Sequence, residues 1–420
     1  ILVVLMEDDK GLLNSRGENN CFLNVVIQSL WHLSIFRSRF FEWNVHKCDR
    51  SQSAAEATCV HCALTWIFSY YSDPDSSLIP PKLLRQTLNN VFREQNRFQM
   101  GDIDDAAEAL EAVLSCLHDN TREEDGEESC VVHNIFGINT LSLVICSTCK
   151  ETSEPTPNLH FVEYTYADDL RAQHKKFPNY SFEKLIHITN QEYKGCPKDD
   201  KHNPCPNVKN QVEKHLLNIP GVIAFGLVWP TATPEVIDIM ETLEIIQPEI
   251  SLEELFLLSS KEQAEASYRF RGMICYYGKH YNAYFYNESA KQWIVFDDAT
   301  VKQVGANWSD VLTRCQRGHF HPSVLFYEKN ESKDSQKPPR EFVVEKQDSP
   351  TKNESSTLPT DITGISTQET STEEKKFEFR QALQAERGVR GGIPTGYRLV
   401  PYPTYRRNHH IKPPFGYTFL

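Results

Sequence analysis

The sequence predicts an α+β fold in which a helical half packs against a half made mostly of antiparallel strands, with a cleft between them. Two observations lead to this prediction. Apolar residues recur at helical spacing early in the chain, over 21–36 and 102–117. Short β-branched and aromatic segments bounded by Gly, Pro, Asn and Asp dominate later, at 219–229, 272–277, 281–286, 293–296 and 323–327.

The first predicted helix begins at Cys21, after the polar turn SRGENN. A thiol at a helix N-terminus lies at the positive end of the helix dipole, which lowers its pKa and raises the thiolate fraction. Position alone leaves open both a reactive thiol and a buried structural cysteine.

The second predicted helix, 102–117, carries carboxylates in its first turn, where the helix dipole favours negative charge. Its apolar residues fall on one face, as expected of a helix that packs on a core: Ile103, Ala106, Leu110, Val113, Leu114 and Leu117.

The late strands include a predicted hairpin, 281–286 with 293–296. This hairpin places His280 at the start of one strand and Asp297 at the end of its neighbour, so the two side chains can face each other. A base held in one tautomer by a carboxylate is what a thiol nucleophile requires. Each residue alone is more typical of a structural role, but together with Cys21 they indicate a catalytic site.

Composition limits the class of protein. The 420 residues are 40% hydrophobic, which suffices for a large core, and the formal net charge of −13 disfavours nucleic-acid binding. The opening run ILVVLM is too short to cross a bilayer, so we expect no membrane span. The segment 329–420 begins with a low-complexity stretch of Ser, Thr, Glu, Lys and Pro, and we expect a disordered tail that could carry a motif for a protein partner.

Several segments resemble known motifs. GLLN at 11–14 with NNCFLN at 19–24 resembles the Cys box of ubiquitin-specific proteases, and GKHYNAYFY at 278–286 with WIVFDDATV at 293–301 resembles their His box. Three further landmarks of the family occur in the expected order: IDDAAEAL, IPGVIAFGLVW and SVLFYEK. Within the family, the sequence is most similar to the branch that contains ubiquitin carboxyl-terminal hydrolases 53 and 54.

The resemblance implies a papain-like cysteine protease with a helical thumb, an antiparallel β palm and zinc-bearing β fingers. The catalytic domain is expected at 11–328, after an N-terminal segment 1–10, with fingers at about 140–215. It also implies a substrate, ubiquitin or polyubiquitin. The cysteine pattern, which is typical of a reducing compartment, predicts a cytoplasmic location, with cell junctions as a further expectation.

Carried over residue by residue, the resemblance implies Cys21 as the nucleophile, His280 as the general base and Asp297 as the group that orients it, with Asp298 as a further acidic candidate. The oxyanion donor stays open. The family places an Asn five residues before its Cys, whereas two extra residues separate Asn14 from Cys21 here, so either Asn14 or Asn19 supplies the amide.

One departure from the family pattern concerns Lys279, which stands where most members have a second Gly before the His. Its side chain either narrows the channel for the substrate's terminal Gly-Gly or points to solvent. Members of this branch are often described as inactive. The alternative function is therefore a pseudo-deubiquitinase that binds ubiquitin or a scaffold partner without cleaving it.

The cysteines suggest structural zinc rather than disulfides, because two Cys-x-x-Cys pairs occur in a large chain. We expect one site at Cys146, Cys149, Cys196 and Cys205, which the family's finger region supports. A second Cys3His set is expected at His46, Cys48, Cys59 and Cys62, with His61 as an alternative ligand. Unliganded cysteines remain the other interpretation of both sets.

Overall fold

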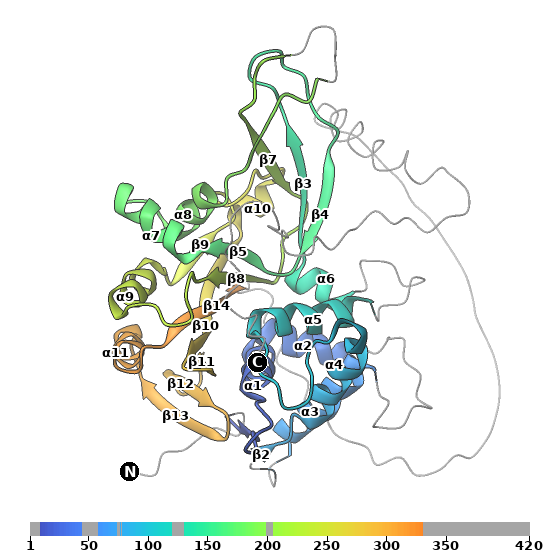
Figure 1. Ribbon diagram of the computed structural model, residues 1–420, viewed down its shortest axis with the longest axis vertical. Helices are drawn as coiled ribbons and strands as arrows, with labels where there is room; N and C mark the ends of the chain where they lie inside the picture. Colours follow the sequence, from blue (N-terminus) through green and yellow to red (C-terminus); the bar gives the residue numbers. More distant parts are fainter. Residues whose placement is uncertain are drawn as a thin grey trace, which may run out of the picture. The chain divides into compact units, whose positions relative to one another are not determined.

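The fold is described from a computed structural model over residues 9–43, 58–73, 76, 78–119, 130–198 and 205–330. Its largest sheet has eight strands in the order β13-β12-β11-β10-β14-β8-β5, with β9 paired to β10 (Figure 1). These strands are β5 (Glu163–Tyr166), β8 (Val222–Val228), β9 (Glu249–Ser251), β10 (Ser267–Tyr277), β11 (His280–Asn287), β12 (Gln292–Asp297), β13 (Thr300–Gly305) and β14 (His321–Lys329). All five predicted late strands are therefore present.

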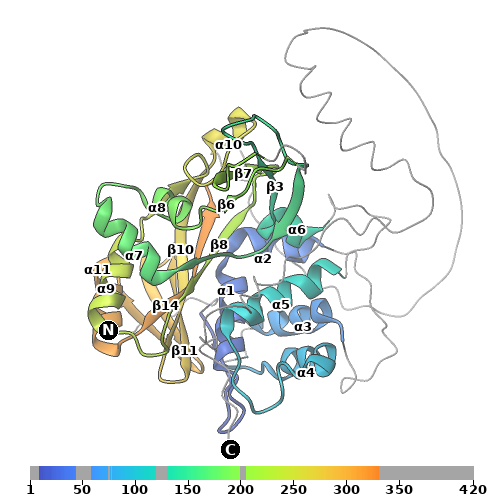
Figure 2. The ribbon, with the colours of Figure 1, turned by 45° about the horizontal axis from the view of Figure 1, so that its top comes forward.

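Helices cover both faces of this sheet (Figures 1 and 2). One face packs on α1 (Cys21–His32), α2 (Ser34–Glu42), α3 (Val60–Tyr71), α4 (Lys82–Val91), α5 (Ala106–Asp119) and α6 (Val131–Phe136). The other packs on α7 (Ala167–Lys176), α8 (Phe182–Thr189), α9 (Val236–Ile245) and α11 (Trp308–Gly318). Successive side chains of a strand point to opposite faces of the sheet, so Ala283 and Phe285 of β11 pack against the first set of helices and Tyr284 packs against the second.

The first helix is shorter than predicted. α1 is buried from Cys21 to Trp31, but Leu33 is extended and α2 begins at Ser34, so 21–36 is not one helix. A distant carboxylate explains the break. Glu328 accepts hydrogen bonds from the Ile35 backbone N–H at 2.7 Å and the Ser34 hydroxyl at 2.9 Å, which caps the start of α2.

The second predicted helix also starts late. α5 begins at Ala106 rather than at 102, because the Asp105 carboxylate caps it by accepting the backbone N–H groups of Ala107 and Glu108 at 2.9 and 3.0 Å. The acidic residues before it therefore lie in a loop that leads to the helix.

A second sheet has four strands in the order β4-β3-β7-β6. They are β3 (Ile138–Val144), β4 (Thr156–His160), β6 (Tyr193–Lys194) and β7 (Asn210–Leu216). The remaining elements are β1 (Gly11–Leu12), β2 (Leu78–Ile79), the 3-10 helix η1 (Arg93–Gln95) and α10 (Lys261–Glu265).

Two pairings depart from the expected antiparallel pattern, since β1 pairs with β2 and β5 with β8 in parallel. Within the described residues, no helix has the length and apolar character needed to span a bilayer. The predicted tail lies outside the described residues from 331 onward.

Candidate active site

Cys21 is the first residue of α1 and its side chain is buried in the core beneath that helix. The first backbone N–H groups of a helix have no partner within the helix, so they point at the region of the Cys21 thiol. The sequence left open whether Cys21 is a reactive thiol at a helix N-terminus or a buried cysteine, and the structure shows that it is both at a helix N-terminus and buried.

His280 and Asp297 face each other across the β11–β12 hairpin. The His280 Nε2 lies 2.6 Å from the Asp297 Oδ1, and the two side chains are 39% and 40% exposed. This contact was expected from the hairpin. The Cys21 thiol is close enough to this imidazole to influence its pKa, so His280 has both a thiol and a carboxylate beside it.

The electrostatics of this trio favour an ion pair. The hydrogen bond that Asp297 accepts, followed by the interaction with Cys21, raises the pKa of His280 to about 10, although partial burial opposes the shift. In return, the hydrogen bond to His280 lowers the pKa of Asp297. The imidazole is therefore held in its charged form, with the negative charge of Asp297 beside it.

Asp298 lies next in the chain, in a left-handed backbone conformation with φ 49°. Its Oδ1 accepts the side-chain amide of Asn24 at 2.7 Å and its Oδ2 accepts that of Asn14 at 2.7 Å. Its carbonyl also accepts the backbone N–H of Leu12 at 2.9 Å. Asp298 thus connects the loop before Cys21, residues 13–20, which we call the nucleophile loop, to the end of β12.

The two candidate oxyanion donors lie in different places. Asn14 donates to Asp298, and its Oδ1 accepts the backbone N–H of Asn20, the residue before Cys21, at 2.9 Å. Asn19 is exposed and donates its amide to the Gly101 carbonyl at 2.7 Å. Asn14 is therefore built into the nucleophile loop, whereas Asn19 joins this loop to the segment before α5.

Lys279 occupies the two-residue turn between β10 and β11, after Gly278. Both residues are left-handed, with φ 59° for Gly278 and φ 67° for Lys279. Such a turn twists with its strands and favours Gly or Asn at both positions. Lys279 is exposed in this structure.

A sequence model described as "Ubiquitin carboxyl-terminal hydrolase" matches residues 10–327. The chain belongs to this family. Ubiquitin carboxyl-terminal hydrolase 54 of Mus musculus is 33% identical over 333 residues, which cover 76% of this chain and 20% of that relative. Ubiquitin carboxyl-terminal hydrolase 53 of Homo sapiens is 32% identical over 333 residues, 76% of this chain and 30% of the relative. The chain thus spans less than a third of either relative, and the sequence resemblance is confirmed.

The fold agrees with this family. The structure of the SAGA Ubp8/Sgf11/Sus1/Sgf73 DUB module bound to ubiquitin aldehyde superposes with a TM-score of 0.51 at 15% identity, covering 79% of this chain and 72% of that one. The predicted ubiquitin-specific protease architecture is confirmed, with α1–α6 as thumb, the eight-stranded sheet as palm and the four-stranded sheet as fingers.

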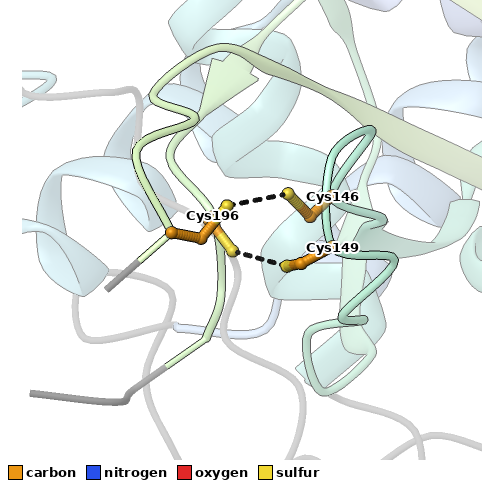
Figure 3. Close-up of side chains that lie close together, drawn as sticks. Cys146, Cys149 and Cys196 are labelled. Atoms are coloured by element: carbon orange, nitrogen blue, oxygen red, sulfur yellow. Dashed lines mark hydrogen bonds between the residues drawn. The ribbon is translucent and has the colours of Figure 1, made fainter. Parts of the chain in front are cut away.

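Four cysteines of this family member come together beside the four-stranded sheet. Cys146 and Cys149 lie on one loop and face Cys196 (Figure 3), and Cys205 completes the group. The Sγ atoms of Cys146 and Cys205 are 3.7 Å apart, and those of Cys149 and Cys196 are 3.4 Å apart. A tetrahedral zinc site with bonds of about 2.3 Å has sulfur–sulfur edges of about 3.8 Å. These four residues could therefore hold a metal ion.

The second expected cluster is only partly described. His46 and Cys48 lie outside the described residues. Cys59 uses its Sγ to accept the backbone N–H of Cys62 at 3.4 Å, as the cap of α3. The alternative ligand His61 is buried, with its ring 4.8 Å from that of Phe40. In the described ranges, Cys59 and Cys62 do not form a group of three potential ligands, and this site stays a prediction.

Two features of the site were missed from sequence. Asn24, which binds Asp298, could have been found because it lies about one helical turn after Cys21, on the same face of α1. The hydroxyl of Tyr281 donates to Asp105 at 3.1 Å, linking the strand after His280 to the cap of α5. No local signal pairs residues so distant in sequence.

Proposed function

We propose that this chain is a cysteine-type deubiquitinase that hydrolyses the isopeptide bond at the C-terminus of ubiquitin. The observation that carries the proposal is the position of His280, beside the Cys21 thiol and in a 2.6 Å contact with the Asp297 carboxylate. Membership of the ubiquitin carboxyl-terminal hydrolase family supports the choice of substrate.

In the proposed reaction, the Cys21 thiolate attacks the carbonyl carbon of the terminal glycine, forming a C–S bond and an oxyanion. The C–N bond then breaks as the His280 imidazolium donates its proton to the departing lysine amine, which leaves a thioester. Water attacks this thioester, His280 takes up a proton from the water, and the C–S bond breaks to release the ubiquitin carboxylate and the Cys21 thiolate. Asp297 keeps the imidazole oriented throughout.

Covalent labelling tests the proposal. A ubiquitin probe with a C-terminal electrophile is incubated with the unmodified protein, with Cys21→Ala and with Cys116→Ala, a partly buried cysteine of α5 in the same thumb. We expect an adduct with the unmodified protein and Cys116→Ala, and none with Cys21→Ala. An adduct that survives Cys21→Ala would contradict the assignment of the nucleophile.

A second candidate function is ubiquitin binding without cleavage. Two observations favour it: Lys279 at the β10–β11 turn beside His280, and the engagement of the Asn14 amide by Asp298. Calorimetric titration with ubiquitin separates the two candidates. If the unmodified protein and Cys21→Ala both bind ubiquitin and neither is labelled, the binding function replaces the hydrolase.

The finer substrate proposal is polyubiquitin. Its support is the similarity to hydrolases 53 and 54, the branch to which the sequence pointed. Cleavage of a monoubiquitin–fluorophore conjugate is compared with that of chains of increasing length. Equal kcat/KM for all of them would remove the preference.

We also propose structural zinc at Cys146, Cys149, Cys196 and Cys205. The fit of the sulfur spacings to a tetrahedral shell supports it, and a closed set of four thiolates leaves no position for a substrate. When bound, the ion would hold the loops that carry these cysteines together. Elemental analysis of purified protein should find about one zinc per chain from this site, and Cys149→Ser should lower that content.

A further inference from the structure

We propose that His280, Asp297 and Asp298 form a reversible, inhibitory binding site for Zn²⁺, distinct from the four-cysteine cluster. The effect on catalysis rests on the proposed function, whereas the binding itself does not.

The first argument is geometric. Each of these three residues offers one ligand atom, and the three atoms lie within 4.8 Å of one another. Zinc bonds to nitrogen and carboxylate oxygen are about 2.0 to 2.2 Å long, so ligand atoms in one shell lie about 3 Å apart. The contact between the His280 Nε2 and the Asp297 Oδ1, now 2.6 Å, needs only a small opening to admit the ion.

The second argument is that the site is already built and accessible. Asp298 is fixed by the amides of Asn14 and Asn24, one on each oxygen. An ionised carboxylate has about four lone-pair positions, so these two bonds leave capacity for a metal. The 39% and 40% exposure of His280 and Asp297 gives an ion direct access from solvent.

The ligand set selects the metal. Imidazole nitrogen and carboxylate oxygen are both zinc ligands, and three such ligands with a further position open to water match the ligand number of zinc sites in enzymes. Mg²⁺ and Ca²⁺ prefer six or more oxygen ligands and are poorly served by an imidazole nitrogen. We therefore expect Zn²⁺ to bind and Mg²⁺ at the same concentration not to bind.

Inhibition follows from the position of the proton. Zn²⁺ on the Nε2 of His280 displaces the proton shared with Asp297, and one proton leaves for solvent. The ring keeps its other proton on Nδ1, the nitrogen left to face Cys21. A ring in this state has no free nitrogen to accept a proton from the Cys21 thiol or from water, so the proton transfers of the reaction stop.

The test uses purified protein with its metal content fixed by elemental analysis, and calorimetric titration with Zn²⁺. We expect one further equivalent to bind the unmodified protein and Cys21→Ser alike. Asp298→Asn should weaken this binding at least about tenfold, as should His280→Gln if Asp298→Asn fails to fold. Asp310→Asn, at the cap of α11, is the matched control and should bind normally.

The outcomes are distinct. Loss of binding in Cys21→Ser would overturn the proposal, because the thiolate would then be a ligand, and so would unchanged binding in both Asp298→Asn and His280→Gln. Absence of a further equivalent would also overturn it. If Zn²⁺ binds as expected but the protein cleaves no ubiquitin conjugate, only the proposed function fails. If it cleaves, the concentration of Zn²⁺ that halves the rate should match the Kd and a chelator should restore the rate.

Discussion

The carboxylate of Asp298 accepts the side-chain amide of Asn14 at 2.7 Å, although the two residues are 284 positions apart. Through its Oδ1, the same Asn14 accepts the backbone N–H of Asn20, directly before Cys21. The nitrogen of the Asn14 side-chain amide therefore binds Asp298, while its oxygen binds the backbone directly before Cys21. The conformation of this loop depends on Asp298 as well as on its own sequence.

This relationship separates the two candidate oxyanion donors. We expect Asn14→Ala to lower kcat by about 10²–10³, the range seen when one donor to an oxyanion is removed. The physical reason is that Asn14 is the amide built into the loop of Cys21. The measurement is hydrolysis of a ubiquitin–fluorophore conjugate at saturating substrate.

Asn19→Ala is the matched control, because the Asn19 amide donates to Gly101 instead. We expect a change in kcat of no more than a few-fold. If Asn19→Ala shows the large loss and Asn14→Ala does not, the assignment is reversed.

Glu111 gives a prediction for the pH dependence of stability. Burial raises the pKa of this carboxyl on α5 to about 7, and the neighbouring Tyr164 opposes the shift. A group whose pKa is 4.5 unfolded and about 7 folded contributes stability below pH 4.5 that is lost as the pH rises through 7. Glu111→Gln should therefore be more stable than the unmodified protein at pH 8, by about 1 to 3 kcal/mol.

Urea unfolding at pH 4.5 and pH 8 is the measurement, and the free energy of unfolding should differ between the two proteins only at the higher pH. The neighbouring charged groups His160, Glu108 and Arg97 are retained in both. Equal stability at pH 8 would show that Glu111 is solvated.

The sequence was sufficient where structure is set by neighbours along the chain. Strand alternation and a short turn predicted the β11–β12 hairpin, and that hairpin alone brings His280 to Asp297. Helical spacing and a polar turn likewise predicted a helix that begins at Cys21. These are local properties of the chain.

Prediction from the sequence failed where the local structure depends on a contact with a residue far away in the chain. The break at Leu33 is capped by Glu328, far away in sequence, and helical periodicity continues through it. The partners of Asp298 are Asn14 in the loop before Cys21 and Asn24 in α1, and no spacing rule relates them to Asp298. Cysteine spacing predicted the group of four, but only the fold could bring Cys205 to Cys146.

Arg85 tests the stability of the thumb. Its side chain is fully buried, lies over the ring of Phe22 at 4.6 Å, pairs with Asp104 at 3.4 Å and donates to the Asp102 carbonyl at 2.6 Å. Removing one partner of a buried ion pair leaves an uncompensated charge, so Arg85→Ala should lower the free energy of unfolding by about 3 to 5 kcal/mol.

Arg39→Ala is the control, because Arg39 and Glu42 form an exposed pair whose side chains are 66% and 64% exposed. We expect a change within about 0.5 kcal/mol for it in urea unfolding. A similar small effect of Arg85→Ala would mean that the loop around Asp102 relaxes and admits water.

Asn210 tests the proposed zinc site. This buried side chain accepts the backbone N–H of Ser147 at 3.0 Å and the amide of Asn207 at 2.9 Å, and it donates to the Lys194 carbonyl at 3.4 Å. It therefore clamps the loop that holds Cys146 to the strand that leads to Cys196. Asn210→Ala should weaken zinc binding by about 10- to 100-fold, measured as transfer of zinc to a chromogenic chelator.

Its neighbour on β7, the exposed Gln211, supplies the control. Gln211→Ala should release zinc at the normal rate. Equal release from both variants would remove Asn210 from the metal site.

Lys279 has a left-handed backbone and lies beside His280, so replacing it can change both the stability and the activity of the protein. A left-handed backbone costs a non-glycine residue about 1 to 2 kcal/mol, so Lys279→Gly should raise the free energy of unfolding by about 1 kcal/mol. Lys291, left-handed with φ 52° at the β11–β12 turn, is a matched control, and Lys291→Gly should stabilise the protein by a similar amount.

The same two variants test whether Lys279 narrows the channel for the substrate tail. If it does, only Lys279→Gly should lower the KM for a ubiquitin–fluorophore conjugate. Equal KM values for both variants would place the Lys279 side chain in solvent during catalysis, and its presence would then no longer support the binding-only function.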